Sequence, residues 1–184
     1  MEWTEFNKTG LLADGGVRAF EKVFTDWFGH LYAYAMSVVK DEETAEEVVQ
    51  AVFCRIWEKR ERLQVHASLK AYLYGSVYHE CMDWLRHRKR VEVHRRHAQA
   101  MHTGGRVMME SASAKVELGE LEKKLQQAIN ELPDQCRAIF CLSRYGELGY
   151  KEIAGQLGIS VKTVEAQISK ALKRLRRKLA DFLV

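Results

Sequence analysis

The sequence predicts an all-α protein in which a flexible linker joins two small helical domains. Along most of the 184 residues, apolar side chains recur at the three- and four-residue spacing of amphipathic helices. The chain has a single proline, whereas a β-sandwich or barrel would need many turn signals. Between Leu85 and Leu118 there is no Leu, Ile, Phe, Trp or Tyr, so this stretch buries too little apolar surface to offset its ordering entropy. We therefore expect domains at residues 15–90 and 118–184 and a linker at 91–117.

The composition excludes several classes of protein. Apolar residues make up 47% of the chain, which excludes disorder over its whole length. No apolar run approaches the roughly 18 residues of a membrane span. The first residues lack the basic start and apolar run of a secretory signal. We therefore expect a cytoplasmic protein with reduced cysteines and no direct membrane insertion.

The net charge of +4 conceals an alternation along the chain. Residues 1–60 carry −4, residues 61–106 carry +5, residues 107–160 carry −2 and residues 161–184 carry +5. Such asymmetry suggests separate surfaces for separate partners. Solvated helix faces of uneven composition would give the same pattern, so charge alone does not decide between the two interpretations.

Three amphipathic helices are predicted in the first domain, at about residues 17–39, 41–60 and 69–90. The second of these has an acidic polar face, and its acidic first turn suits a helix N-terminus. The third is expected to be capped by Ser68 and ends in a cationic run at residues 86–90 that suits phosphate contact. Tyr74 and Trp84 belong to its apolar face, whereas Tyr72 and His79 lie on the opposite face and are expected to be exposed, as stacking on unpaired bases would require.

The second domain has the pattern of a helix-turn-helix. A short helix at residues 150–157 is followed by Gly158, which can adopt the left-handed conformation of a sharp turn, and by Ser160, a favourable cap for a longer helix. The outward side of that helix carries residue types that contact base edges and phosphates in a major groove. With the cap, these residues are Ser160, Lys162, Thr163, Glu165, Ala166, Ser169, Lys170, Lys173 and Arg174.

Over residues 18–90 and 120–180, the chain resembles an extracytoplasmic-function RNA polymerase sigma factor. Residues 41–57 are similar to region 2.2 of that family, and residues 72–86 resemble its region for melting and reading the minus-ten element. Region 4, which reads the minus-thirty-five element, is resembled by a set of short segments in the second domain. These are Leu132-Pro133, Arg137 and residues 151–154, 158–160, 163–164 and 171–172. Each segment alone is moderately specific, but their order around a linker makes the resemblance strong.

The resemblance implies a region-2 helical bundle and a region-4 helix-turn-helix that direct promoter-specific initiation. The implied partners are core RNA polymerase, through its clamp coiled coil and flap, and promoter DNA, both as duplex and as melted nontemplate strand. An anti-sigma factor is the expected regulator. For polymerase binding, the implied residues are Asp41, Glu43, Glu46, Glu47, Gln50, Phe53 and Trp57. For the minus-ten element, with a loop at 59–67 that captures a flipped base, they are Lys59, Arg62, Lys70, Tyr72, His79, Asp83, Arg86, Arg88, Lys89 and Arg90. The helix-turn-helix residues named above would read the minus-thirty-five element.

Two positions depart from the family pattern. His79 stands where the family often has Asn, so a role close to the bases is in doubt at that position. Gly149 stands where Ser or Thr is common, which removes half of a capping box with Glu152.

Two other functions compete with this interpretation. A stand-alone helix-turn-helix regulator would share the C-terminal features, but it would need a receiver or ligand-binding domain upstream, which the acidic helix and its basic neighbour do not fit. An enzyme or metal protein would need clustered ligands or a nucleophile with its base. Cys136 and Cys141 lie about 140° apart around a helix, and Cys54 and Cys81 are on separate helices. We therefore expect no catalytic residue, no metal and no cofactor.

Overall fold

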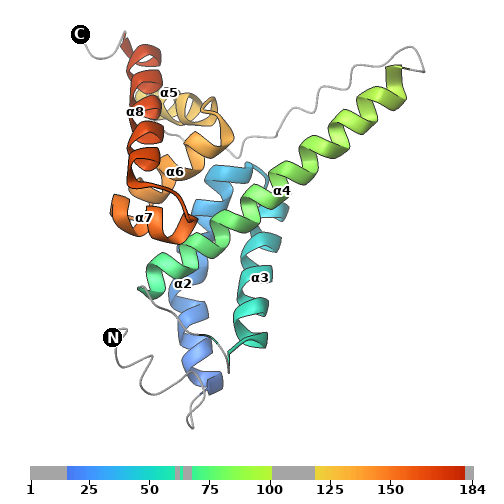
Figure 1. Ribbon diagram of the computed structural model, residues 1–184, viewed down its shortest axis with the longest axis vertical. Coiled ribbons are helices and arrows are strands. Elements are labelled where there is room, and N and C mark those ends of the chain that lie inside the picture. The colour runs from blue at the N-terminus through green and yellow to red at the C-terminus, as the bar shows by residue number, and fades with distance from the viewer. Residues whose placement is uncertain (1–15, 61–62, 64–67, 101–118, 181–184) are drawn as a thin grey trace.

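The computed structural model describes residues 16–60, 63, 68–100 and 119–180. Within these residues all regular structure is helical, which confirms the predicted fold class (Figure 1). The helices are α2 (Gly16–Val39), α3 (Glu42–Glu58), α4 (Leu69–Ala100), α5 (Glu120–Asn130), α6 (Asp134–Arg144), α7 (Tyr150–Leu157) and α8 (Val161–Lys178). We refer to α2–α4 as the first helical group and to α5–α8 as the second.

The first helical group forms because each helix buries one apolar face against the other two. Lys40 has a φ of 63° and turns the chain between α2 and α3. Asp41 then caps α3, since its Oδ1 accepts a hydrogen bond from the Thr44 amide at 2.9 Å. Ser68 caps α4 in the same way, by accepting from the Ala71 amide at 3.1 Å, as its sequence position predicts. Both caps fix where a helix begins and therefore which residues it points outward.

The second helical group contains the predicted helix-turn-helix. Gly158 has a φ of 64°, the left-handed conformation expected of it, and ends α7. Ser160 Oγ accepts from the Thr163 amide at 3.0 Å and begins α8. Ile153 and Val164 are fully buried between α7 and α8. The turn and its cap are therefore confirmed.

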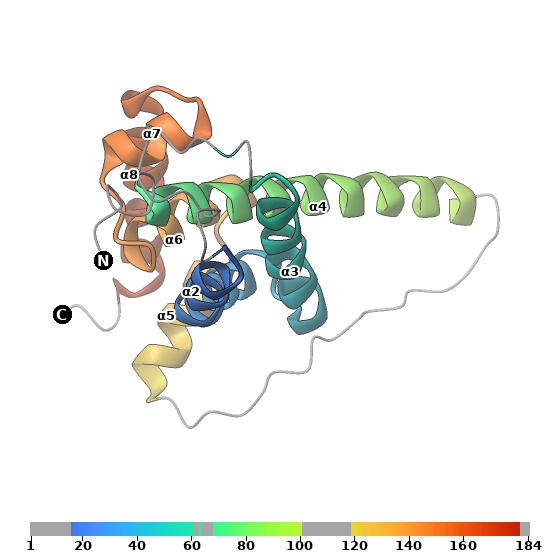
Figure 2. The same ribbon diagram turned by 90° about the horizontal axis from the view of Figure 1, so that it is seen from below.

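Helix α4 is longer than the sequence predicts, which corrects the start of the linker. The helix continues to Ala100 and extends away from the other helices, whereas a linker was expected from residue 91 (Figures 1 and 2). Val91 and Val93 are about half exposed, so this extension is not held by a core. Arg and Glu are good helix formers, and Arg95 pairs with Glu92 one turn away at 3.4 Å. A lack of large apolar residues predicts a lack of burial, but it does not predict where a helix ends. The rest of the expected linker lies outside the described residues.

The two helical groups share one hydrophobic core. Helix α6 contacts both α2 and α4, and α7 contacts α4. Tyr34 of α2, Leu73 of α4 and Ile139 of α6 are all completely buried in a single cluster. Amphipathic spacing indicates that each helix has a buried face but not which helix covers it, so the sequence did not predict this contact between the groups.

Candidate polymerase and nucleic-acid interfaces

The polar face of α3 is an exposed acidic strip. Glu43, Glu46, Glu47 and Gln50 are all exposed, while Val48 and the other apolar positions between them are buried. Gln50 Nε2 donates to Glu46 Oε1 at 2.9 Å, which aligns two of these side chains along the helix. The strip, which we define as Glu43, Glu46, Glu47 and Gln50, is placed as the sequence predicts.

Asp41 lies at the end of this strip and is the N-cap of α3. Its carboxylate accepts from both the hydroxyl and the backbone amide of Thr44, and these hydrogen bonds lower the pKa of Asp41 below its usual value. The negative charge also lies at the N-terminus of α3, where the helix dipole favours it. Asp41 therefore determines where the acidic strip starts.

The two aromatic residues assigned to polymerase binding differ in exposure. Phe53 is only 2% exposed, because it packs against the rings of Phe24 and Phe28 at 4.8 and 6.4 Å. It therefore holds α3 against α2 and cannot itself touch a partner, which corrects its assignment as a binding residue. Trp57 is half-buried, with the Arg60 guanidinium 4.4 Å from its ring centre, and keeps an accessible edge.

Only some of the residues assigned to the minus-ten element are exposed. Lys59 is exposed, whereas Arg62 and most of the loop at 59–67 lie outside the described residues. Tyr72 was expected to be exposed but is half-buried, because its ring packs against the core. His79 keeps an exposed ring, yet its Nε2 lies 3.2 Å from the Gln156 carbonyl oxygen of α7.

The later part of α4 carries a dense run of exposed cations. Arg86, Arg88, Lys89 and Arg90 are all exposed. Arg86 pairs with Asp83, Arg88 lies 5.2 Å from the Trp84 ring centre, and Lys89 pairs with a carboxylate of the second helical group. The exposed cations of this run surround the helix, and a basic helix is suited to contact with a phosphate backbone.

The outer face of α8 is exposed along its whole length. Thr163 is the exception, since it is half-buried, and its hydroxyl lies 2.8 Å from the capping Ser160 hydroxyl. At α7, Gly149 donates its amide to Glu152 Oε2 at 2.9 Å, so the half of the capping box that glycine allows is retained. The exposed residues of this face are Ser160, Lys162, Glu165, Ala166, Ser169, Lys170, Lys173 and Arg174.

Two cations that join the helical groups had no role assigned from the sequence. Arg137 of α6 is 2% exposed, and its guanidinium donates to the carbonyl of Val38, in the last turn of α2, at 2.6 Å. In return, Lys40 donates to the carbonyl of Asn130, the last residue of α5. Burial lowers the pKa of Lys40 from its usual value. Each group thus supplies a cation to the unpaired carbonyls at a helix end of the other.

Known families match both helical groups. The family model described as Sigma-70 region 2 matches residues 23–91, and the model described as Sigma-70, region 4 matches residues 122–175. The ECF RNA polymerase sigma factor SigM of Bacillus subtilis (strain 168) is 23% identical over 85% of this chain and 92% of its own. The ECF RNA polymerase sigma factor RpoE of Cereibacter sphaeroides is 24% identical over 88% of this chain and 87% of its own. The chain belongs to the extracytoplasmic-function sigma factors.

Solved structures share the fold of this sigma factor. The sigma factor RpoE from Bartonella quintana, in complex with the anti-sigma factor NepR, gives a TM-score of 0.67 at 22% identity, over 89% of this chain and 98% of that chain. CnrH in complex with the cytosolic domain of CnrY gives a TM-score of 0.63 at 21% identity, over 91% and 92%. As a sigma factor, the chain binds core RNA polymerase and directs transcription initiation at promoters, and it is not an enzyme. The match to region 2 disfavours a stand-alone regulator, which has no such region.

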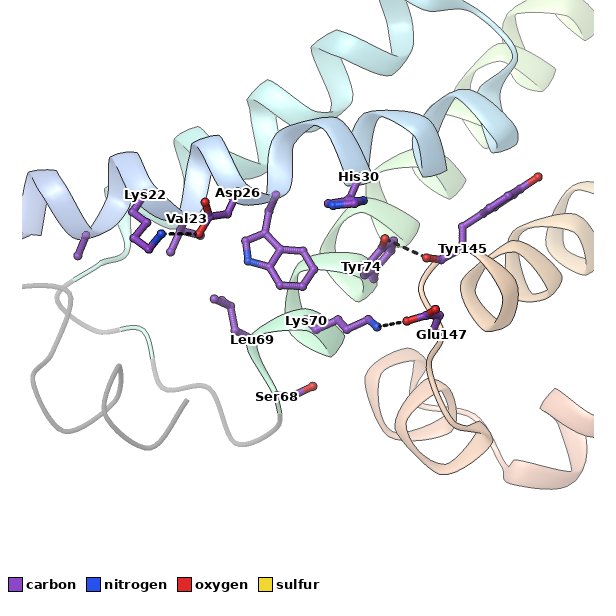
Figure 3. A pocket seen from close by; sticks show the side chains of 12 residues that line it. Lys22, Val23, Asp26, His30, Ser68, Leu69, Lys70, Tyr74, Tyr145 and Glu147 are labelled. Carbon is purple, nitrogen blue, oxygen red and sulfur yellow. Dashed lines mark hydrogen bonds and ion pairs between the residues drawn. The ribbon is translucent and has the colours of Figure 1, made fainter. Parts of the chain in front are cut away.

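A cleft of about 770 Å³ in this sigma factor lies where the two helical groups meet (Figure 3). Its walls come from α2, the start of α4 and the segment between α6 and α7. Trp27 and Tyr74 meet edge to face in it, with ring centres 6.4 Å apart. Lys70 pairs with Glu147 across it at 3.2 Å. No pattern in the sequence predicts this cleft, because its walls come from segments far apart in the chain.

The cysteines of the sigma factor are unpaired. Cys54 is exposed on α3, whereas Cys81, Cys136 and Cys141 are buried. Burial raises the pKa of Cys81 to about 12, so this residue stays a protonated thiol. Among the described residues, no three His, Cys, Asp or Glu side chains lie close enough together to hold a metal ion. No helix in that part of the chain is both long and apolar enough to cross a membrane.

Proposed function

We propose that this sigma factor binds core polymerase through the acidic strip of α3, the minus-ten element through α4 and the minus-thirty-five element through α8. The observation that carries the proposal is the separation of charge between these helices. The acidic strip is exposed on α3, and the cations of α4 and α8 are exposed on other elements. Each surface therefore offers a predominant sign of charge to one kind of partner.

Polymerase docking through α3 relies on a rigid acidic surface. Glu46 and Glu47 point outward because Val48 and Val49 are buried against the neighbouring helices. In this proposal the clamp coiled coil would lie opposite this strip, and the flap would contact the second helical group. Trp57 would add an apolar edge at the end of the strip, where aromatic side chains contribute strongly to interfaces.

Promoter recognition divides between two basic helices. The cationic run of α4 would hold phosphates of the melted nontemplate strand, beside the loop at 59–67 that captures a flipped base. The first turns of α8 would enter the major groove of the duplex, where Lys162 and Glu165 reach base edges and Lys170 and Lys173 lie closer to phosphates.

Regulation and location follow from the same family. The two solved relatives described above are complexes with an anti-sigma factor and with the cytosolic domain of a partner protein. We extend this to the present chain as a proposed anti-sigma partner. The chain would act in the cytoplasm, where core polymerase and promoter DNA are found.

Charge reversal on the acidic strip tests polymerase docking. Glu46→Lys with Glu47→Lys replaces two exposed anions by cations, and we expect loss of co-purification with core polymerase by more than tenfold. Helicity and the unfolding midpoint should stay unchanged, because neither side chain is buried. Transcription of genomic DNA by purified core polymerase, with and without each variant, reads out the consequence and identifies the promoters.

The matched control carries the same change in charge elsewhere. Glu21→Lys with Glu122→Lys alters two exposed glutamates on α2 and α5 and should leave co-purification intact. If the α3 variant still binds core polymerase as well as this control, the docking assignment is wrong.

Alanine substitutions on α8 test recognition of the upstream element. The triple alanine variant at Lys162, Glu165 and Lys170 should bind promoters as holoenzyme at least tenfold more weakly. Each good base contact contributes about 1–3 kcal/mol of discrimination. The spectrum of transcribed promoters should broaden. A control in which Arg18, Glu122 and Lys123 become alanine removes the same charges from exposed sites outside α8. Unchanged promoter choice and affinity in the α8 variant would disprove the assignment.

A further inference from the structure

The cleft between the two helical groups has the size and the location of a small-molecule site. Its volume of about 770 Å³ falls within the roughly 300–1,000 Å³ of ligand pockets in proteins, which often lie where domains meet. One wall is a face of α2 that runs from Ala19 to His30, and the rest comes from the start of α4 and the segment between α6 and α7. The polymerase and promoter surfaces proposed above include none of its lining residues apart from Lys70.

Aromatic rings from several elements line the cleft. Trp27 lies edge to face with Tyr74, with ring centres 6.4 Å apart, and its ring centre is 6.3 Å from that of His30. Tyr145, which follows α6, is 47% exposed, although its ring is large and mostly apolar. His30, Tyr74 and Tyr145 come from three different elements and all line the cleft (Figure 3). These rings favour a ligand that is itself flat and aromatic, because offset and edge-to-face contacts between rings are attractive.

The charged side chains that line the cleft are paired with one another. Lys22 pairs with Asp26 one turn along α2 at 3.1 Å, and Lys70 pairs with Glu147 at 3.2 Å. The two cations and the two carboxylates together carry no net charge. An ionic ligand would have to displace one member of a pair, whereas a neutral ligand leaves both pairs intact. The cleft therefore favours an uncharged ligand.

The wall formed by the segment between α6 and α7 is held in position by the chain itself. Glu147 has a φ of 46°, a left-handed conformation that is uncommon for a residue other than glycine. Such backbone strain persists only where surrounding contacts hold it, and it is frequent at ligand sites. Here the contacts are the pair with Lys70 and the hydrogen bond that the Tyr74 hydroxyl donates to the Tyr145 carbonyl at 3.3 Å. A wall that is already in position reduces the ordering cost of binding.

We propose that the cleft is a binding site for a neutral, planar aromatic molecule. The rings of Trp27 and Tyr145 contact this ligand, and the paired charges at the cleft stay paired. The ligand binds only where α2, α4 and the segment between α6 and α7 lie together, so it stabilises the folded chain against unfolding. The proposal does not depend on the polymerase and promoter assignments above.

Titration of the full chain with indole tests the site. Indole is flat, aromatic and uncharged, and its binding can be followed at the backbone amides by two-dimensional NMR of isotope-labelled protein. We expect saturable shifts at Trp27, Lys70 and Tyr145 and none in the acidic strip of α3. The unfolding midpoint should rise with the indole concentration. Indole-3-acetate and tryptamine carry the same ring system with a negative or a positive charge, and each should bind several-fold more weakly.

A matched pair of variants locates the ligand. Ala19→Trp places a large side chain in the cleft and should weaken indole binding at least tenfold, with little change in the unfolding midpoint because Ala19 is only partly buried. Thr25→Trp adds the same side chain to an exposed position of α2 outside the cleft and should leave binding unchanged. Tyr145→Ala removes one ring of the cleft and should weaken binding several-fold.

Four results would overturn the proposal. Shifts that do not saturate, or that spread evenly over the surface, would show non-specific partition of indole. Equal binding by Ala19→Trp and Thr25→Trp would place the ligand elsewhere. Wild-type affinity in Tyr145→Ala would contradict the aromatic contact, and this variant decides the question if Ala19→Trp does not fold. Tighter binding of either charged analogue than of indole would show that the ligand class is wrong.

Discussion

At the scale of single residues, Arg137 connects parts of the chain that the sequence keeps far apart. Its side chain is almost completely buried and donates to the carbonyls of Val38 and Leu132. A buried guanidinium is costly unless its donors are satisfied, and the last carbonyls of a helix lack partners of their own. Both terminal nitrogens of Arg137 have acceptors, whereas its buried Nε has none among the described residues. At the end of α2, the Arg137 guanidinium donates to a helix carbonyl that would otherwise lack a partner. This explains why a cation is buried between the two helical groups.

Asp41 gives the most direct prediction at this scale. Asp41→Ala removes the cap of α3 and should lower the free energy of unfolding by about 1 kcal/mol, whereas Asp41→Asn keeps an acceptor and should lose less. Hydrogen bonds to Thr44 depress the pKa of Asp41 in the folded state, so the stabilisation is complete above the unfolded-state pKa and is lost as the pH falls through the folded-state value. Urea unfolding at neutral and acidic pH measures both effects. An Asp41→Ala variant that matches the wild type at neutral pH would contradict the capping role.

At the scale of elements, local signals located helix starts but not every helix end. Ser68 and Ser160 cap α4 and α8 as predicted, and Gly158 takes the left-handed conformation, because capping and turn geometry depend on a few adjacent residues. The end of α4 was placed ten residues too early, since an exposed charged helix carries no apolar periodicity. The acidic strip was predictable, because the spacing of apolar residues along α3 shows which side chains face outward. The burial of Phe53 depends on tertiary contacts, and periodicity does not show how deep they lie.

The cationic run of α4 makes a prediction about salt. Arg88→Ala with Arg90→Ala removes two exposed cations, and each lost contact with a single-strand phosphate should reduce the slope of log affinity against log salt by about 0.7. Holoenzyme binding to promoter DNA over a series of salt concentrations measures this slope. Arg18→Ala with Lys123→Ala removes two exposed cations from α2 and α5 and should leave the slope unchanged. If both double variants show the wild-type slope, these α4 cations do not contact phosphates.

At the scale of the whole molecule, the shared core makes the two helical groups dependent on each other. Each group alone is close to the size at which a domain is only marginally stable. Tyr34, Leu73 and Ile139 come from three helices and both groups, yet all three are fully buried in one cluster. Separation of the groups would expose this apolar surface to water, so each group depends on the other for its stability.

Unfolding of the free chain tests this dependence. Trp27, Trp57 and Trp84 lie in α2, α3 and α4, so their fluorescence reports on the first helical group, while hydrogen exchange in α8 reports on the second. In the wild type the two transitions should coincide, because the groups unfold together. Arg137→Met leaves buried carbonyls without their donor and should lower stability by about 1–3 kcal/mol or more and separate the two transitions, with α8 unfolding first. Arg144→Met, on the exposed end of the same helix, should change stability by no more than about 0.5 kcal/mol and keep them together. Two separate transitions already in the wild type would show that the shared core does not couple the groups.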